Sequence, residues 1–136
     1  HIPEILQNLT ALGAVEPTLS FTPALAPMSR GILAVCTAPI APGVSETEVR
    51  AAYQQAYAAE PFAQFCAPGV WPSTKWVQGS NSFMVQATVD AAAGRLVAVG
   101  TLDNLTKGTA GQAIQAMNLS LGLTETTGLS AIGMMP

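Results

Sequence analysis

The chain has 136 residues, which suits one domain with one hydrophobic core. Hydrophobic residues make up 49% and charged residues only 10%, whereas about a quarter of a typical soluble domain is charged. This sparse charge indicates a surface partly covered by another domain or subunit, unless the chain is simply rich in Ala and Gly. The net charge of −3 and the scattered Lys and Arg residues argue against nucleic-acid binding, and no apolar run reaches the ~18 residues of a membrane span.

The first forty residues predict a helix, a connector and a strand. Pro3 suits a first helical turn, apolar residues recur at helical spacing up to Leu12, and Gly13 can end the helix. Residues 20–22 are a candidate short edge strand, followed by a turn. Residues 31–38 are apolar on both faces, which predicts a strand covered on both sides, with Cys36 buried in it.

The middle of the chain predicts a second helix and a hairpin. Ser45 and Glu48 have the spacing of a capping box, and the helix that they begin is ended by Pro61. A short strand over 62–67 and a loop over 68–76 follow. Residues 77–90 and 95–103 then alternate in the manner of two antiparallel strands joined by a turn at 91–94.

The last segment predicts a helix that begins at Thr106 or Lys107 and has Gly122 as its C-cap. Its expected buried stripe consists of Ala110, Ala113, Ile114, Met117 and Leu121. Residues 129–136 are apolar enough for a closing strand. Together, these expected helices and strands predict an α+β domain, with helices packed on one face of a mixed, mostly antiparallel sheet.

Residue types alone indicate little chemistry. The chain has one His, so a His-based metal cluster is excluded, and it contains no Gly-x-Gly-x-x-Gly string, phosphate-binding loop or Gly-x-Ser-x-Gly elbow. The two cysteines are too few for a disulfide framework. With no secretory signal at its start, the sequence leads us to expect a soluble cytoplasmic protein.

Six strings in order give the chain a specific resemblance. They are His-Ile-Pro-Glu-Ile (1–5), Phe-Thr-Pro with Pro-Met-Ser-Arg-Gly-Ile (21–32), Glu-Pro-Phe (60–62), Lys-x-Val-x-Gly-Ser-Asn (75–81), Asp-Asn-Leu-x-Lys-Gly-x-Ala-Gly-Gln-Ala-x-Gln-x-Met-Asn (103–118) and Gly-Leu-x-Glu-Thr-x-Gly-Leu (122–129). Together they resemble the N-acetyl-gamma-glutamyl-phosphate reductases. The family's Gly-rich dinucleotide fingerprint and its Pro-Gly-Cys nucleophile turn, which lie upstream of these strings, are not in the chain.

The resemblance implies a fold and an activity. Residues 1–136 would be the substrate-binding and dimerisation domain, similar to the C-terminal domain of glyceraldehyde-3-phosphate dehydrogenase, with a helix over about 106–122 returning towards the nucleotide-binding domain. The activity is NADPH-dependent reduction of N-acetyl-gamma-glutamyl phosphate to the semialdehyde and phosphate, in arginine biosynthesis. A cysteine thiolate would attack the acyl phosphate, and the thioester would accept a hydride.

The resemblance also gives candidate substrate contacts. His1 is the candidate acid/base for the nucleophile, although the family has a second His two positions earlier that can take this role. Glu4 can orient the His1 imidazole or favour the helix start. Arg30 can bind a carboxylate or phosphate through two nitrogens, or can form a packing salt bridge. Ser80 and Asn81 line the substrate pocket or form a turn.

The candidate cofactor contacts are Asn104, Lys107 and Gly108. They lie at the start of the last helix, where free N–H groups and a positive helix end suit anions or a carboxamide, although helix capping is the alternative. The expected partners are the acyl-phosphate substrate, the nucleotide-binding domain and a second subunit. Two rival hypotheses are a stand-alone binding or dimerisation module without catalysis and a related dehydrogenase with another acyl phosphate.

Overall fold

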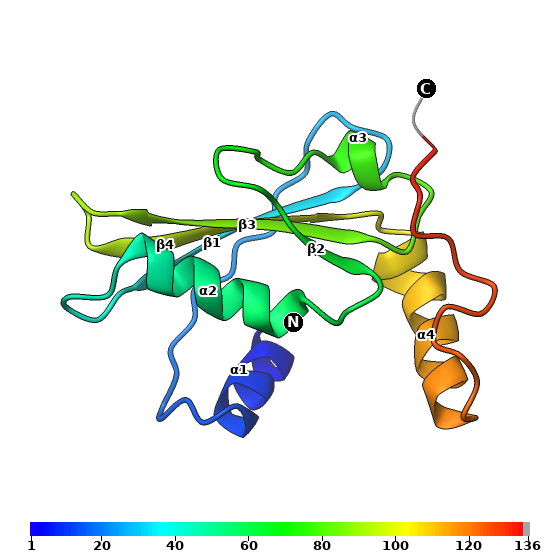
Figure 1. Ribbon diagram of the computed structural model, residues 1–136, viewed down its shortest axis with the longest axis horizontal. Coiled ribbons are helices and arrows are strands. Elements are labelled where there is room, and N and C mark those ends of the chain that lie inside the picture. Colours follow the sequence, from blue (N-terminus) through cyan, green and yellow to red (C-terminus); the bar gives the residue numbers. More distant parts are fainter. Residues whose placement is uncertain (135–136) are drawn as a thin grey trace.

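The computed structural model of the chain describes residues 1–134 and is built on a four-stranded sheet (Figure 1). The spatial order is β1 (Ile32–Pro39), β4 (Arg95–Leu102), β3 (Phe83–Asp90) and β2 (Ala63–Phe65). β4 runs antiparallel to both of its neighbours, β1 and β3, and only the short edge strand β2 runs parallel to its neighbour. The predicted α+β class and the mixed, mostly antiparallel sheet are therefore confirmed.

Helices surround this sheet. Figure 1 shows α1 (Ile2–Ala11) and α2 (Glu46–Tyr57) on one side of it, the single turn α3 (Thr74–Val77) on the other, and the last helix projecting from one end. That last helix begins as a π-helical turn, η1 (Thr106–Ala110), and continues as α4 (Gly111–Ser120). The buried apolar side chains are Phe62 before β2, Val77 on α3, and Val85 and Ala87 on β3.

The predicted capping box starts α2. Ser45 Oγ accepts from Glu48 N at 3.2 Å, while Glu48 Oε2 accepts from Ser45 N at 2.8 Å, so each side chain satisfies a backbone N–H of the other residue. Arg50 then fixes the helix to the sheet by donating to Gln86 Oε1 at 2.6 Å and to the Cys66 carbonyl at 2.8 Å. Local sequence sets the beginning of α2, and a buried polar contact sets its place.

The predicted hairpin is present, with a later start than expected. Its strands end with Asp90 opposite Arg95, and residues 91–94 form the turn. The first strand begins at Phe83 rather than at residue 77, because 74–77 form α3 and 78–82 are turns. The expected loop over 68–76 therefore contains a helix start, which Ser73 Oγ caps by accepting from Lys75 N at 3.4 Å.

β1 corrects the prediction of a strand covered on both faces. All its residues are exposed, including Cys36 and Val35, the latter by 61%. The strand forms an edge of the sheet, and residues 18–24 and Ile5 stand away from it across a groove of about 940 Å³. Apolar composition predicted burial, yet within residues 1–134 nothing covers this edge.

α4 corrects the predicted buried stripe. Ile114, Met117 and Leu121 are 38%, 49% and 66% exposed, whereas Gln115 and Asn118 are buried on the neighbouring face of the helix. Gly122 has the expected left-handed conformation after the helix, with φ +68°. The helical period was predicted correctly, but the buried face is polar.

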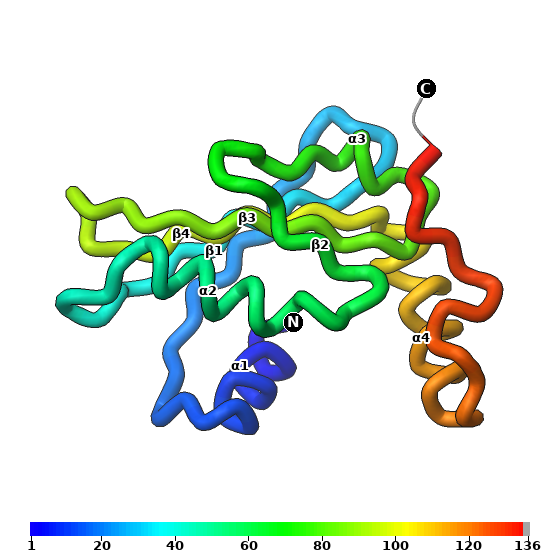
Figure 2. The backbone as a smooth tube through the Cα atoms, viewed as in Figure 1, coloured from blue at the N-terminus to red at the C-terminus, as the bar shows by residue number. Residues whose placement is uncertain are grey.

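The chain after α4 runs back beside that helix and continues past α3 (Figure 2). Asn81 N donates to the Ser130 carbonyl at 2.7 Å, and Met134 N donates to the Gln78 carbonyl at 2.8 Å. These bonds do not form the regular ladder of a β-sheet, so the predicted closing strand is wrong over 129–134. Residues 135–136 of that prediction lie outside the described residues. Residues 20–22 do not form the expected edge strand.

Candidate functional site

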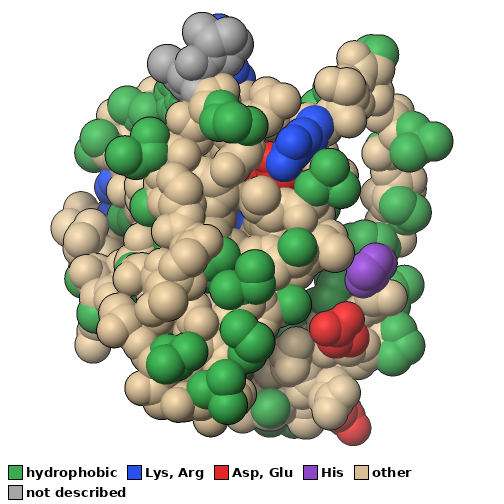
Figure 3. Space-filling view, turned by 90° about the vertical axis from the view of Figure 1, so that its right-hand side faces the viewer, with side chains coloured by type: hydrophobic (Ala, Val, Ile, Leu, Met, Phe, Trp, Pro, Cys, Tyr) green, Lys and Arg blue, Asp and Glu red, His purple; other side chains and the backbone are tan. Residues whose placement is uncertain are grey.

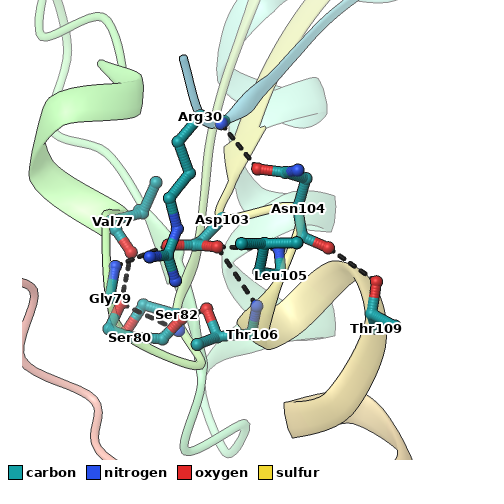
Figure 4. A network of polar contacts seen from close by, with 11 residues as sticks. Arg30, Val77, Gly79, Ser80, Ser82, Asp103, Asn104, Leu105, Thr106 and Thr109 are labelled. Carbon is teal, nitrogen blue, oxygen red and sulfur yellow. Dashed lines mark hydrogen bonds and ion pairs between the residues drawn. The ribbon is translucent and has the colours of Figure 1, made fainter.

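An ion pair between Arg30 and Asp103 lies at the centre of the candidate site (Figure 4). Arg30 precedes β1, and Asp103 follows β4, so the antiparallel pairing of these strands brings the two residues together. Arg30 Nε is 2.8 Å from Asp103 Oδ2, although its N–H does not point directly along that line. The Asp103 side chain is fully buried, and that of Arg30 is 26% exposed.

Asp103 accepts three backbone hydrogen bonds in addition to the ion pair. Oδ2 accepts from Gly79 N at 2.5 Å, and Oδ1 accepts from Leu105 N and Thr106 N at 2.8 and 3.1 Å. Burial by itself raises the pKa of Asp103, but these N–H groups and Arg30 outweigh it and lower the pKa to about 2. Asp103 is therefore a carboxylate at neutral pH and joins three segments of the chain.

Asn104 fixes the beginning of β1. Its Oδ1 accepts from Gly31 N at 2.7 Å, and its Nδ2 group donates to no acceptor within the described residues. Gly31 has φ +111°, and a Cβ at this position would lie 2.9 Å from Thr74 Cβ. A glycine is thus needed here, and the Asn104 carboxamide uses its oxygen, but not its N–H₂ group, within the described residues.

The other two candidate cofactor residues have contacts within the protein. Lys107 Nζ donates to Gln115 Oε1 at 2.6 Å and lies 5.7 Å from the centre of the Phe62 ring. Burial lowers the pKa of Lys107, and the charges of Glu125 and Glu60 oppose this shift. Gly108 N donates to the Asp103 carbonyl at 2.9 Å. The structure thus places Lys107 inwards and Gly108 in tight packing.

Ser80 and Asn81 are buried below the Arg30–Asp103 pair. Ser80 Oγ donates to the Val77 carbonyl at 2.8 Å, and the Ser80 carbonyl accepts from Thr106 Oγ1. Asn81 Nδ2 donates to Gln115 Oε1 at 2.9 Å, while its Oδ1 has no hydrogen-bond partner. Ser80 thus belongs to a turn, whereas Asn81 also lines a pocket of about 280 Å³ together with Thr106, Gly111 and Ser130.

His1 and Glu4 lie apart from this cluster, on the exposed helix α1. The His1 ring contacts the Phe21 ring at a centroid distance of 5.7 Å, and the single His of the chain stands at the surface in Figure 3. Figure 3 also shows apolar side chains scattered over this face among few charged ones. The predicted residues therefore divide into a surface imidazole and the part-buried Arg30 and Asn104, which lie on either side of Asp103.

Asp103 is the residue that sequence reasoning missed. It stands first in the string Asp-Asn-Leu-x-Lys-Gly, directly before a helix, where an acidic side chain can accept from free N–H groups. That signal was available, but the pairing with Arg30 depends on the sheet. Among residues 1–134, no group of three or more His, Cys, Asp or Glu side chains is placed to hold a metal ion.

The family model that matches the chain is described as "Semialdehyde dehydrogenase, dimerisation domain" and covers residues 1–104. The chain belongs to this family. The residues matched by the family model include His1, Arg30, Asp103 and Asn104. Lys107 and α4 lie after the end of the match. None of the helices in the described part is long and apolar enough to cross a membrane.

Curated relatives carry a more specific name. Proteins from Streptomyces coelicolor and Thermobifida fusca are each 57% identical to this chain over 136 residues. One from Streptomyces clavuligerus is 58% identical over 137 residues. All three are named N-acetyl-gamma-glutamyl-phosphate reductase. The match covers 100% of this chain and 40% of each relative, so the chain spans well under half of their length.

Proposed function

We propose that this chain is the substrate-binding and dimerisation part of an N-acetyl-gamma-glutamyl-phosphate reductase. The observation that supports this most is the match of all 136 residues, at 57% identity, to proteins of that name. The reaction is N-acetyl-gamma-glutamyl phosphate plus NADPH and a proton giving the semialdehyde, NADP⁺ and phosphate. Its setting would be arginine biosynthesis in the cytoplasm, and the nucleophile and the dinucleotide-binding motif would belong to the remaining length of the relatives.

The chain's own residues would bind the substrate and move a proton. Arg30 supports anion binding, because its terminal guanidinium nitrogens have no hydrogen-bond partner within residues 1–134 and the side chain reaches solvent. His1 supports proton transfer, because its exposed imidazole can donate a proton from one ring nitrogen and accept one at the other. Glu4 lies one turn further along the same helix and would orient the imidazole.

NADPH would contact this part through Asn104. Its free Nδ2 group is a suitable donor for a carboxamide oxygen, and its Oδ1 is already held by Gly31 N. When bound, NADPH supplies the hydride. Lys107 and Gly108 would act indirectly, since they fix the helix start that carries Asn104.

A chimera tests this function. The chain replaces the matching segment of the Streptomyces coelicolor relative, and NADPH oxidation is followed with N-acetyl-gamma-glutamyl phosphate. We expect turnover within about 10-fold of the parent reductase. His1→Ala should lower kcat by about 100-fold or more and leave KM nearly unchanged, as for the loss of an acid/base group. Turnover without N-acetyl selectivity would instead favour a related dehydrogenase with another acyl phosphate.

A second subunit is proposed to cover the exposed apolar residues of β1, because such a surface is unusual in a monomer. Val35→Lys in the chimera should lower its mass in light scattering to that of a smaller oligomer. Val15→Lys is the matched control, since Val15 is 90% exposed and lies outside β1. An unchanged oligomer in both variants would place the subunit contact elsewhere.

The alternative, a stand-alone binding module, makes a different prediction about size. Intact mass of the natural protein would separate the two functions. A protein longer by on the order of 150 residues or more agrees with the reductase proposal, because one further domain has about that size. A natural protein of 14.0 kDa would favour the binding module.

A further inference from the structure

Asp103 is a fully buried acid whose contacts all come from neighbouring segments of the same site. It holds Gly79 N, Leu105 N and Thr106 N, and it faces Arg30 Nε at 2.8 Å. Three of these four contacts need only a hydrogen-bond acceptor. The fourth contact is the ion pair with Arg30, whose Nε faces Asp103 while its side chain is partly exposed to solvent.

The contact determines which part of Arg30 remains available. A guanidinium group has five N–H donors in one rigid plane, and Asp103 engages the single donor at Nε. The two terminal nitrogens, which together fit a carboxylate or a phosphoryl group, make no hydrogen bond within the described residues. Because Nε is buried beside a carboxylate that three backbone N–H groups hold in place, the position of the fork is restricted.

Asp103 and Arg30 together carry no net charge, but the terminal nitrogens of Arg30 keep their donors for a second anion. Three backbone N–H groups and the positive end of the helix that starts at Thr106 already stabilise the carboxylate. Arg30 is therefore not needed to neutralise Asp103 alone. Its charge remains available at the partly exposed terminal nitrogens, in surroundings that hold few other charged groups.

We propose that Asp103 is a positioning residue that presents the two terminal nitrogens of Arg30 as a clamp for an anionic group of the substrate. The proposal rests on the proposed reductase function. The clamp would take either the carboxylate or the phosphoryl group of the acyl phosphate, which share the required planar pair of oxygens. Asp103 itself touches neither substrate nor cofactor.

The test uses the chimeric reductase in the oxidation direction, where semialdehyde, phosphate and NADP⁺ give acyl phosphate, NADPH and a proton. This direction separates the two anions, because phosphate and the semialdehyde carboxylate enter as different substrates. We expect Asp103→Asn and Arg30→Gln each to raise one of the two KM values by about 10- to 100-fold, the effect of one charge-assisted contact, with kcat within about 3-fold. A raised KM for phosphate identifies the phosphoryl group, and a raised KM for semialdehyde identifies the carboxylate.

The double variant tests whether Asp103 acts through Arg30. If it does, Asp103→Asn combined with Arg30→Gln should have nearly the same KM as Arg30→Gln alone. Additive effects on KM would overturn the proposal, and so would unchanged KM values in a folded Asp103→Asn enzyme. The matched controls are Asp90→Asn and Arg95→Gln, which lie beside the turn at the opposite end of the hairpin and should keep both KM values.

Arg30→Lys decides the question if Asp103→Asn does not fold. Lys keeps the charge and leaves Asp103 intact, but an ammonium group cannot present two nitrogens in one plane. We expect its KM to rise nearly as much as in Arg30→Gln, and a KM at the parent value would overturn the clamp. Failure of the parent chimera to turn over would count against the reductase function instead, so the two failures are distinguishable.

Discussion

Arg30 and Asp103 are 73 residues apart in the sequence, and their side chains meet at 2.8 Å because β1 begins where β4 ends. The pair is asymmetric: Asp103 is fully buried, whereas Arg30 reaches solvent through the end of its side chain. An interior carboxylate and a surface cation are thus joined across two neighbouring strands.

The low pKa of Asp103, about 2, makes stability depend on acid pH. Because its folded pKa lies below the usual 3.8, the stabilisation is present above pH 4 and is lost as pH falls towards 2. A shift of this size corresponds to about 2 kcal/mol. We expect the unfolding free energy of the protein to fall by about that amount more than in Asp103→Asn when urea titrations at pH 5 and pH 2 are compared. Equal losses in both proteins would contradict the assignment.

Lys107 gives a pH dependence of the same direction in an alkaline range. Burial lowers its folded pKa below 10.5, so the unfolded chain binds more protons between the two values and stability rises with pH in that window. Lys107→Met keeps the apolar stem over Phe62 and removes the charge. Urea titrations from pH 8 to pH 10.5 should show the unfolding free energy of the parent rising relative to this variant. A constant difference across the series would mean that the folded pKa is not lowered.

The sequence predicted most elements because local signals determine them. The capping box at Ser45, the turn before Arg95 and the glycine after α4 all act over a few residues, and the structure contains all three. The α+β class followed from the order of these elements. The Arg30–Asp103 pair could not be predicted in this way, because only the strand order β1-β4-β3-β2 brings the two residues together.

Predictions failed where burial was inferred from apolar character. The stripe on α4 has the correct period but the wrong face, because Gln115 and Asn118 form hydrogen bonds to the returning chain, and the methyl-rich face remains exposed. Cys36 and Val35 are exposed for a related reason, since no other element of residues 1–134 covers the faces of β1. An apolar pattern indicates that a face will be covered, but it does not say whether the same domain covers it.

Asn118 should stabilise the returning chain. Its Nδ2 donates to the carbonyls of Glu125 and Thr127 at 3.1 and 2.9 Å, and its side chain is 1% exposed. Asn118→Ala leaves two carbonyls without a partner, so we expect a loss of about 2–3 kcal/mol in unfolding free energy. Gln112→Ala, at an exposed position of the same helix, should change it by less than about 0.5 kcal/mol. Amide hydrogen exchange should become faster over residues 123–130 in the first variant only.

Gly111 is needed for close packing rather than for backbone freedom. It lies inside a helix, where alanine is ordinarily favoured by about 1 kcal/mol, yet an added Cβ would lie 2.3 Å from Asn81 Oδ1 and 2.9 Å from the Thr106 carbonyl. Gly111→Ala must therefore displace the Asn81–Gln115 hydrogen bond, and we expect a net loss of about 1–3 kcal/mol, as in other overpacked sites.

Gly122→Ala is the informative comparison for Gly111→Ala in the same urea titrations. No atom lies within 4 Å of a Cβ added at Gly122, so only its left-handed backbone, φ +68°, opposes the change, by about 1 kcal/mol. The two substitutions should also respond differently when each is combined with Asn81→Ala. Removing the Asn81 amide relieves the contact at Gly111 and should bring the effect of Gly111→Ala close to zero, while Gly122→Ala stays unchanged. If Asn81→Ala did not reduce the loss, the Thr106 carbonyl would be the group that excludes a side chain at Gly111.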